Sequence, residues 1–390
     1  MVYFLSHPIQ YFSPLLRQLS RRASLQVYYY TGDSPDPGID KGFGKAVAWD
    51  IPLLEGYSFQ FLENKKKRTN PGSRLWDVFN PGIPAVIRKS PEKIVLMNGW
   101  SYSSDWLVAL SSKCFGKKLW LRAENPLNQE LKKSRTVRLI KKFLLGKILF
   151  GGLTDKCLYI GKESKEFFRY YGVPEHKLIY TPYAVDNDFF HAAWLRLKDQ
   201  KTTLKEKLGI PTNKKIIIFT GKYIPKKRPM DLLIAAGALQ AENYFLVMVG
   251  DGELRGEMEN YIRQQQLTNV LLTGFVNQSA IPEYYAMGDV FVMCSGLGET
   301  WGLAVNEAMN FCLPVIVSDT CGCSPDLVRA GYNGYTFPEG DTDRLTTLIR
   351  EATASEETTQ KMGEASWEIV QTYSIDAIVE NIQQYNVNPA

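Results

Sequence analysis

The chain has 390 residues, of which 45% are hydrophobic, 12% aromatic and 22% charged. This length exceeds one ordinary hydrophobic core, so we expect two domains of similar size, and the composition excludes a disordered, fibrous or membrane-spanning protein. The formal net charge of +5 is small, and no recognisable nucleic-acid-binding motif accompanies the basic residues, so nucleic acid is not an expected partner.

Apolar segments that alternate with amphipathic helices predict a parallel α/β sheet in the first half of the chain. The expected strands are 1–5, 25–30, 93–97, 119–121 and 177–180, and the expected helices are 12–20 and 164–171. Residues 160–163, followed by the second of these helices, indicate a further strand-turn-helix. Such alternation is typical of parallel sheets with helical crossovers. We therefore expect residues 1–183 to form a doubly wound, Rossmann-like domain.

A second series of strands and helices follows. The expected strands are 215–220, 244–249, 270–273, 290–293 and 315–317, with helices 231–239, 253–265, 281–287 and 302–310. This predicts a second Rossmann-like domain over 184–372, and a break at Tyr373-Ser374 separates it from a last helix within 373–390. Open parallel sheets bind ligands beyond the carboxyl ends of their strands, so two such domains place the active site in the crevice between them.

Apolar runs and cysteines limit the other possibilities. The longest apolar runs, such as 216–219 and 245–249, have the length of buried strands and fall short of a bilayer span. The first residues lack a basic leader and a long apolar run, so we expect no signal peptide and a cytoplasmic protein. Six cysteines without paired metal spacing and only three histidines indicate free thiols, no zinc site and no other metal.

Residues 131–150 combine basic and apolar side chains. Seven basic residues and no acidic residue lie between Glu130 and Asp155, and they alternate with apolar residues as in a basic amphipathic helix. Two interpretations stay open. The helix lies on an anionic membrane, which would place the protein peripherally on the inner face, or it is a solvated helix whose apolar side packs on its own domain.

Two carboxylates stand eight residues apart where a helix is expected to follow a buried strand. If the whole interval is helical, roughly 12 Å along the axis separates Glu299 from Glu307, so they cannot share a proton but can hold two ends of an extended ligand. Gly302 lies between them at the expected helix start, where backbone N–H groups and the dipole favour a phosphate. A carboxylate on each side of a phosphate-binding helix start is the pattern that suits a sugar nucleotide. Taken alone, the junction also fits a structural first-turn charge at Glu299 and a solvated Glu307.

A basic loop follows the strand 215–220. Lys222, Lys226, Lys227 and Arg228 gather within seven residues, just before an expected helix. Cations here can neutralise a departing diphosphate by electrostatics, without a metal ion. A solvated basic loop is the alternative when this motif is taken alone.

Together, the two motifs resemble the nucleotide-binding domain of the GT-B fold glycosyltransferases, in particular the large retaining group numbered family four. That family has Gly-Arg, a short gap and Lys-Gly in the loop after the first strand of its C-terminal domain, and Gly221-Lys222 and Lys227-Arg228 stand there with both cations kept. Glu299 and Glu307 meet its Glu-x7-Glu motif. The resemblance covers about 160–385, and further matches are 182–190, Gly250 with Gly252, 274–276, 314–322, Asn333-Gly334 and Gly340-Asp341.

The resemblance implies an acceptor-side and a nucleotide-sugar-binding Rossmann-like domain that face a cleft, with a last helix that crosses back to the first domain. It also implies a retaining, metal-independent hexosyltransferase. The donor would be a UDP- or GDP-sugar with no further cofactor, the acceptor a saccharide or lipid-linked hydroxyl, and the setting cell-surface polysaccharide or glycolipid synthesis. It assigns Glu299 to the transferred sugar and Glu307 to the ribose. Lys222 and Lys227 are assigned to the diphosphate. The other expected nucleotide-binding positions are Gly302, Leu303, Gly221, Gly250, Phe275 and Val276.

The first half resembles the family less closely. Ser6-His7-Pro8 replaces a glycine-rich first loop that is frequent among relatives, and His7, at the end of the first strand, is a candidate catalytic residue with a structural histidine as the alternative. Arg122, Glu124 and Asn125 end another strand, where acceptor contacts compete with surface ion pairing. The alternative function for the whole chain is a catalytically silent sugar-nucleotide-binding or membrane-surface scaffold protein. Retention of both carboxylates and both lysines weighs against it.

Overall fold

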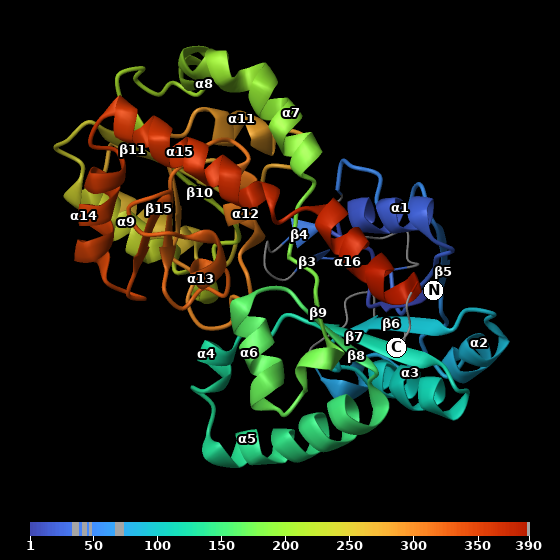
Figure 1. Ribbon diagram of the computed structural model, residues 1–390. Helices are drawn as coiled ribbons and strands as arrows, with labels where there is room; N and C mark the ends of the chain where they lie inside the picture. The colour runs from blue at the N-terminus through green and yellow to red at the C-terminus, as the bar shows by residue number, and fades with distance from the viewer. Residues whose placement is uncertain (33–38, 41–44, 47–48, 67–73, 388–390) are drawn as a thin grey trace. The chain divides into compact units, whose positions relative to one another are not determined.

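The computed structural model describes residues 1–32, 39–40, 45–46, 49–66 and 74–387, and many of its elements are labelled in Figure 1. The chain divides into two compact units. Unit 1 consists of Met1–Ile39, Val47–Pro182 and Ile375–Ala390, and unit 2 of Asp40–Ala46 and Tyr183–Ser374. Each unit is built around its own parallel sheet.

Unit 1 contains a seven-stranded sheet in the order β5-β2-β1-β6-β7-β8-β9, and all of its neighbouring strands are parallel. The order reverses between β1 and β6, as in a doubly wound fold. Its strands are β1 (Val2–Leu5), β2 (Gln26–Tyr29), β5 (Ser58–Phe61), β6 (Ile94–Asn98), β7 (Lys118–Ala123), β8 (Lys156–Tyr159) and β9 (Leu178–Tyr180).

Helices cover both faces of this sheet because successive side chains of its buried strands point to opposite sides. Val2 and Phe4 of β1 share a core with α2 and α3, whereas Tyr3 lies with its ring centroid 6.4 Å from that of Phe12, just before α1. The helices are α1 (Ser13–Arg22), α2 (Ile83–Lys89), α3 (Ser103–Cys114), α4 (Leu127–Glu130), α5 (Arg135–Lys141), α6 (Lys162–Tyr170) and α16 (Ile375–Val387), with a π-helix η2 (Lys142–Leu153) directly after α5.

The C-terminal helix α16 packs on the first helix of unit 1. Gln18 Nε2 and Arg22 Nη2 of α1 donate to Asp376 Oδ1 at 2.9 and 3.0 Å, and Gln383 Nε2 donates to the carbonyl of Arg22 at 2.9 Å. The apolar side of α16 is buried. The last turns of the chain therefore complete the unit in which the chain begins.

A buried carboxylate begins helix α3 in unit 1. Asp105 is 2% exposed, and its Oδ2 accepts the backbone N–H of Tyr102 at 2.9 Å. Burial raises the pKa of this carboxyl to about 7, although the backbone N–H groups that it accepts act in the opposite direction. The folded protein therefore holds a proton that the unfolded chain releases near pH 4.

We expect the Asp105 carboxyl to make the protein less stable as the pH rises. Its contribution is fully present below the unfolded pKa and is lost as the pH rises through the folded pKa of about 7. Asp105→Asn, which keeps the acceptor oxygen and removes the ionisation, should raise the free energy of unfolding at about pH 8 by roughly 1–3 kcal/mol. Urea unfolding between about pH 4 and pH 8 tests this. An unchanged pH slope in the variant would contradict it.

Unit 2 contains a six-stranded parallel sheet in the order β12-β11-β10-β13-β14-β15. Its order reverses between β10 and β13, which is the strand order of a classic dinucleotide-binding fold, and ligands of such folds bind at this switch point. The strands are β10 (Lys215–Thr220), β11 (Tyr244–Val249), β12 (Val270–Leu272), β13 (Val290–Met293), β14 (Val315–Ser318) and β15 (Gly334–Phe337).

Helices again lie on both faces. Ile217 and Phe219 of β10 share a core with Leu232 of α9 and Leu348 of α14, whereas Ile218 points to the other face, where it lies against Gly288 after α11. The helices are α7 (Asn187–Leu197), α8 (Lys201–Lys207), α9 (Pro229–Ala238), α10 (Arg255–Gln264), α11 (Ile281–Ala286), α12 (Leu303–Met309), α13 (Ser324–Leu327), α14 (Thr342–Ala352) and α15 (Glu356–Gln371).

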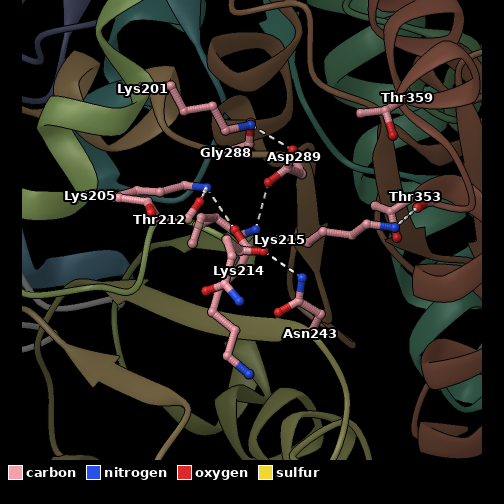
Figure 2. Close-up of polar contacts among 12 residues, drawn as sticks. Lys201, Lys205, Thr212, Lys214, Lys215, Asn243, Gly288, Asp289, Thr353 and Thr359 are labelled. Atoms are coloured by element: carbon pink, nitrogen blue, oxygen red, sulfur yellow. Dashed lines mark hydrogen bonds and ion pairs between the residues drawn. The ribbon is translucent and has the colours of Figure 1, made fainter.

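Several lysines lie at the amino-terminal end of β10, whereas the basic loop 222–228 follows its carboxyl end (Figure 2). Lys201 Nζ lies 2.6 Å from Asp289 Oδ1, and Asp289 Oδ2 accepts the backbone N–H of Ile216 at 2.7 Å. Lys205 Nζ donates to the carbonyls of Thr212 and Lys214 at 3.1 and 2.7 Å. These lysines tie α8 to the sheet, so their role is structural and distinct from that of the basic loop after β10.

The predicted fold class is confirmed, because both halves contain a doubly wound parallel sheet. Sequence analysis missed the edge strand β5, the helices α2 and α3, and the strand β15. Strand β15 begins at Gly334, where a Cβ atom would lie 1.8 Å from the carbonyl oxygen of Val315, so a residue of low strand propensity is required there. Among the residues that the structure describes, no helix is long and apolar enough to cross a bilayer.

Candidate active site at the switch point of unit 2

Two loops meet at the carboxyl ends of β10 and β13. These strands are adjacent and parallel, with Ile217 opposite Val290, so residues 221–228 and 294–302 leave the same edge of the sheet. The backbone N–H of Gly296 donates to the carbonyl of Lys226 at 2.9 Å and joins the loops. The two motifs that were about 70 residues apart in the sequence are therefore neighbours.

A carboxylate and two lysines form the centre of this site. Lys227 Nζ contacts Glu299 Oε2, and Lys226 Nζ lies 3.9 Å from the same oxygen. Glu299 is only 7% exposed. Burial raises the pKa of its carboxyl, but the charges of Lys227 and Lys226 outweigh burial and hold the pKa below its usual range. Glu299 is therefore an ionised acceptor at neutral pH, and its contact is with the loop lysines.

Glu307 lies inside helix α12 and is 2% exposed, so the alternative of a solvated Glu307 is wrong. Tyr285 Oη of α11 donates to Glu307 Oε2 at 2.6 Å, and Thr220 Oγ1 lies 2.7 Å from the same hydroxyl. Thr220 is the last residue of β10 and directly precedes Gly221. The second carboxylate is thus connected to the strand end from which the basic loop leaves.

The interval between the two glutamates is not one helix. Glu299 lies in the loop, Gly302 is the N-cap with a φ of +102°, and α12 starts only at Leu303. The axial separation expected for a continuous helix therefore does not apply. A Cβ atom on Gly302 would lie 2.6 Å from Met293 Sδ and 3.0 Å from Cys321 Sγ, so both the left-handed backbone and the close packing require glycine.

Glycines also bring the neighbouring loops together. A Cβ atom on Gly250, after β11, would lie 1.8 Å from the carbonyl oxygen of Gly221, and the backbone N–H of Gly250 donates to Gly274 at 3.0 Å. Phe275 and Val276 follow Gly274 and are half-buried. The loops after β10, β11 and β12 therefore lie against one another.

The remaining predicted positions of unit 2 lie at the same edge. Lys222 follows Gly221 in the loop after β10, and Leu303 is the first residue of α12. Both are half-buried. Unit 2 therefore gathers the expected nucleotide-binding residues at the carboxyl ends of its strands.

Sequence analysis missed two supporting groups. Tyr285 carried no motif, because a tyrosine in a short helix has no signature of its partner. Arg228 was seen only as one base of four, but it has a left-handed φ of +48° and its Nη1 lies 3.6 Å from Glu339 Oε1 after β15. The backbone N–H of Gly322, after β14, donates to the carbonyl of Glu299 at 3.2 Å, which supports the loop from behind.

His7 and the other candidates of the first half lie in unit 1. Ser6 Oγ lies 3.0 Å from His7 Nδ1 directly after β1. Arg122 is 2% exposed and its Nη1 lies 3.0 Å from Glu124 Oε1, so this ion pair is not a surface pair on the arginine side. The catalytic role of His7 stays a prediction.

The comparisons with known proteins concern the family and the fold of the chain. Residues 200–368 match the family model described as glycosyl transferases group 1. Over these residues the chain is similar to that family. The chain is 29% identical over 205 residues to spore coat protein SA of Bacillus subtilis, covering 49% of this chain and 52% of that protein. It is 29% identical over 207 residues to sulfoquinovosyl transferase SQD2 of Arabidopsis thaliana, covering 52% and 38%.

The chain thus spans about half or less of the length of these curated relatives. Among solved structures, HepE of Anabaena in complex with UDP and glucose superimposes with a TM-score of 0.72 and 16% identity over 99% of both chains. At this identity the likeness shows the fold alone, which is the GT-B fold of two Rossmann-like domains.

Proposed function

We propose that the protein is a retaining hexosyltransferase that transfers a sugar from a nucleoside diphosphate to an acceptor hydroxyl. The observation that carries the proposal is the Lys226, Lys227 and Glu299 cluster beside buried Glu307, at the switch point of the matched unit. The match of residues 200–368 to the family model described as glycosyl transferases group 1 supports the reaction class. UDP- and GDP-sugars are the proposed donors.

The lysines would exchange partners when the donor binds. In the described structure Lys227 contacts Glu299, and a diphosphate with a higher negative charge would attract Lys227 and its neighbour Lys222. Glu299 would then accept hydrogen bonds from hydroxyls of the transferred sugar. As the bond between the anomeric carbon and the phosphate oxygen breaks, negative charge grows on the diphosphate, and the lysines stabilise it.

The acceptor hydroxyl would attack the anomeric carbon from the face that the diphosphate leaves, so the anomeric configuration is retained. The bond from the anomeric carbon to the phosphate breaks, the bond to the acceptor oxygen forms, and the leaving phosphate oxygen takes the acceptor proton. No protein nucleophile is required in this sequence of events. His7, from unit 1, is proposed to contact the acceptor.

Glu307 is proposed to hold the ribose. One of its oxygens already accepts the hydroxyl of Tyr285. A carboxylate offers about four lone-pair directions, so Glu307 can also accept hydrogen bonds from ribose hydroxyls. Gly221, Gly250 and Gly302 would let the nucleotide approach the backbone, and Phe275 and Val276 would contact the base.

The names of related proteins support the proposed setting. HepE was solved with UDP and glucose, and SQD2 is named for the transfer of sulfoquinovose. We propose a saccharide or lipid-linked acceptor and a role in cell-surface polysaccharide or glycolipid synthesis.

A panel of nucleotide sugars tests the proposal. The correct donor should raise the melting temperature, because it binds only the folded protein. Incubation with that donor and candidate acceptors should release the nucleoside diphosphate, and proton NMR of the product should show the anomeric configuration of the donor. An inverted product would overturn retention. A donor that binds but is never consumed, with water or any acceptor, would favour a silent sugar-nucleotide-binding protein.

A further inference from the structure

The segment from Leu131 to Ile148 in unit 1 exposes an unusual concentration of apolar side chains. Seven of the 16 exposed large hydrophobic residues among the described part of the chain lie in it, and Phe143 is 62% exposed. Monomeric proteins rarely expose contiguous apolar surface of this kind without a partner. The exposed members are Leu131, Val137, Leu139, Ile140, Phe143, Leu144 and Ile148.

The winding of the segment separates an inner from an outer apolar side. In the π-helix η2, residues four and five positions apart share a face, because its hydrogen bonds run from i to i+5. Leu145, Leu149 and Phe150 follow this spacing and are buried, and the ring of Phe150 lies 5.5 Å from that of Trp100. Phe143 and Ile148 follow the same spacing and are exposed, and so is Leu139 of α5, four positions before Phe143.

The inner side therefore packs in the core of unit 1, whereas the side chains of the outer side are exposed and add nothing to that core. Gly146 lies against unit 1 closely enough that a Cβ atom there would be 2.6 Å from the carbonyl oxygen of Tyr171. The interpretation that the segment packs on its own domain therefore describes its inner side. The exposed outer side is left for the membrane interpretation.

Positive charge accompanies the exposed apolar side chains. Residues 131–153 contain seven lysines and arginines and no acidic residue. Lys133 and Lys141 are neutralised, because their Nζ atoms lie 2.8 and 2.6 Å from the carboxylate of Glu130. Arg135, Lys142 and Lys147 are exposed, and none of the ion pairs among the described residues includes them. A surface that is both apolar and positively charged complements a negatively charged lipid bilayer.

We propose that the exposed side of residues 131–148, here called the docking surface, binds the protein to the surface of an anionic lipid bilayer. Phe143, Ile140 and their apolar neighbours enter the boundary between headgroups and acyl chains. Arg135, Lys142 and Lys147 bind the lipid phosphates. The lysines of the donor site lie in unit 2 and take no part, so this inference is independent of the proposed function.

Flotation of the full chain with lipid vesicles tests the docking surface. The protein should float with phosphatidylcholine vesicles that contain about one third phosphatidylglycerol and stay unbound with pure phosphatidylcholine, and salt at about 0.5 M should weaken binding. Absence of binding to the anionic vesicles, or equal binding to both compositions, would overturn the proposal.

Two variants separate the apolar from the electrostatic contribution. Ile140→Ser/Phe143→Ser should lower the vesicle partition coefficient at least about 10-fold, since two inserted side chains are lost. Arg135→Gln/Lys142→Gln/Lys147→Gln should lower it roughly 100-fold, at about 1 kcal/mol for each basic residue. The matched control is Leu110→Ser/Phe115→Ser, two apolar residues exposed elsewhere in unit 1, which should bind as the wild type does.

All variants should keep the wild-type melting temperature, because the changed side chains are exposed. Equal loss of binding in the Leu110→Ser/Phe115→Ser control would overturn the assignment to residues 131–148. So would a wild-type dimer in light scattering that Ile140→Ser/Phe143→Ser converts to a monomer, because the surface would then be a protein interface.

Discussion

Lys227→Gln is expected to lower the rate of sugar transfer by about 100- to 1,000-fold at saturating donor. The lysine is the base in closest contact with Glu299, and in the proposed reaction it stabilises charge that develops on the leaving diphosphate. Because the loss falls on the transition state, kcat should drop far more than KM rises. Steady-state release of the nucleoside diphosphate, with acceptor, measures both constants.

Lys226→Gln is the matched control on the same loop. Its Nζ lies 3.9 Å from Glu299 and its side chain is 39% exposed, so solvent screens its charge and we expect a loss of about 10-fold or less. Equal losses in the two variants would show that only the total charge of the loop matters. A Lys227→Gln enzyme with wild-type kcat would exclude Lys227 from the diphosphate site.

Lys227→Gln should also change the pH dependence. Loss of the lysine removes the larger of the two charges that lower the pKa of Glu299, so burial, which raises it, should dominate. Donor binding that depends on ionised Glu299 should then be lost at a higher pH than in the wild type as the pH falls. Donor affinity measured between about pH 4 and pH 8 tests this shift, and coincident profiles would contradict it.

The second large effect is expected at the other carboxylate. Glu307→Gln should weaken binding of the nucleoside diphosphate about 10- to 100-fold, because hydrogen bonds to a charged acceptor contribute roughly 1.5–3 kcal/mol. Calorimetric titration with UDP and GDP measures the loss. The control is Glu257→Gln, an exposed glutamate of α10 in the same unit, which should bind as the wild type does.

A ligand change identifies the contact of Glu307. If its carboxylate binds the ribose hydroxyls, a deoxyribose analogue of the same diphosphate should bind the wild type more weakly, but should lose nothing further in Glu307→Gln. Such non-additivity is the signature of two groups that interact. Additive losses would place the ribose elsewhere and leave Glu307 as a structural acceptor for Tyr285.

Strands of unit 2 were predictable to the residue where burial is continuous. The strands Lys215–Thr220, Tyr244–Val249 and Val290–Met293 have apolar side chains on both faces along most of their length, and their limits are those predicted from the sequence. The edge strand β5 was missed because its Ser58, Phe59 and Gln60 are exposed and no pattern of burial marks them.

The site was predictable as two motifs but not as one cluster. The contact between Lys227 and Glu299 depends on the adjacency of β10 and β13, which the order of strands along the chain does not reveal. The expected helix start at about Gly302 is confirmed, because Gly302 is the N-cap of α12, so the separation calculated for a wholly helical interval does not apply. Similarly, the i to i+5 winding of η2 that separates Phe143 from Phe150 has no signature in the sequence.

The return of α16 to unit 1 has a consequence for biosynthesis. Ile378, Val379 and Ile382 of this helix are buried, and its polar side chains bond to Arg22 and Gln18 near the start of the chain. While the ribosome is still translating unit 2, an apolar face of unit 1 stays exposed, because α16 has not yet been synthesised. Unit 2 consists almost entirely of one continuous segment, so it can fold before α16 is made. Unit 1 therefore leaves the ribosome first but completes its folding last.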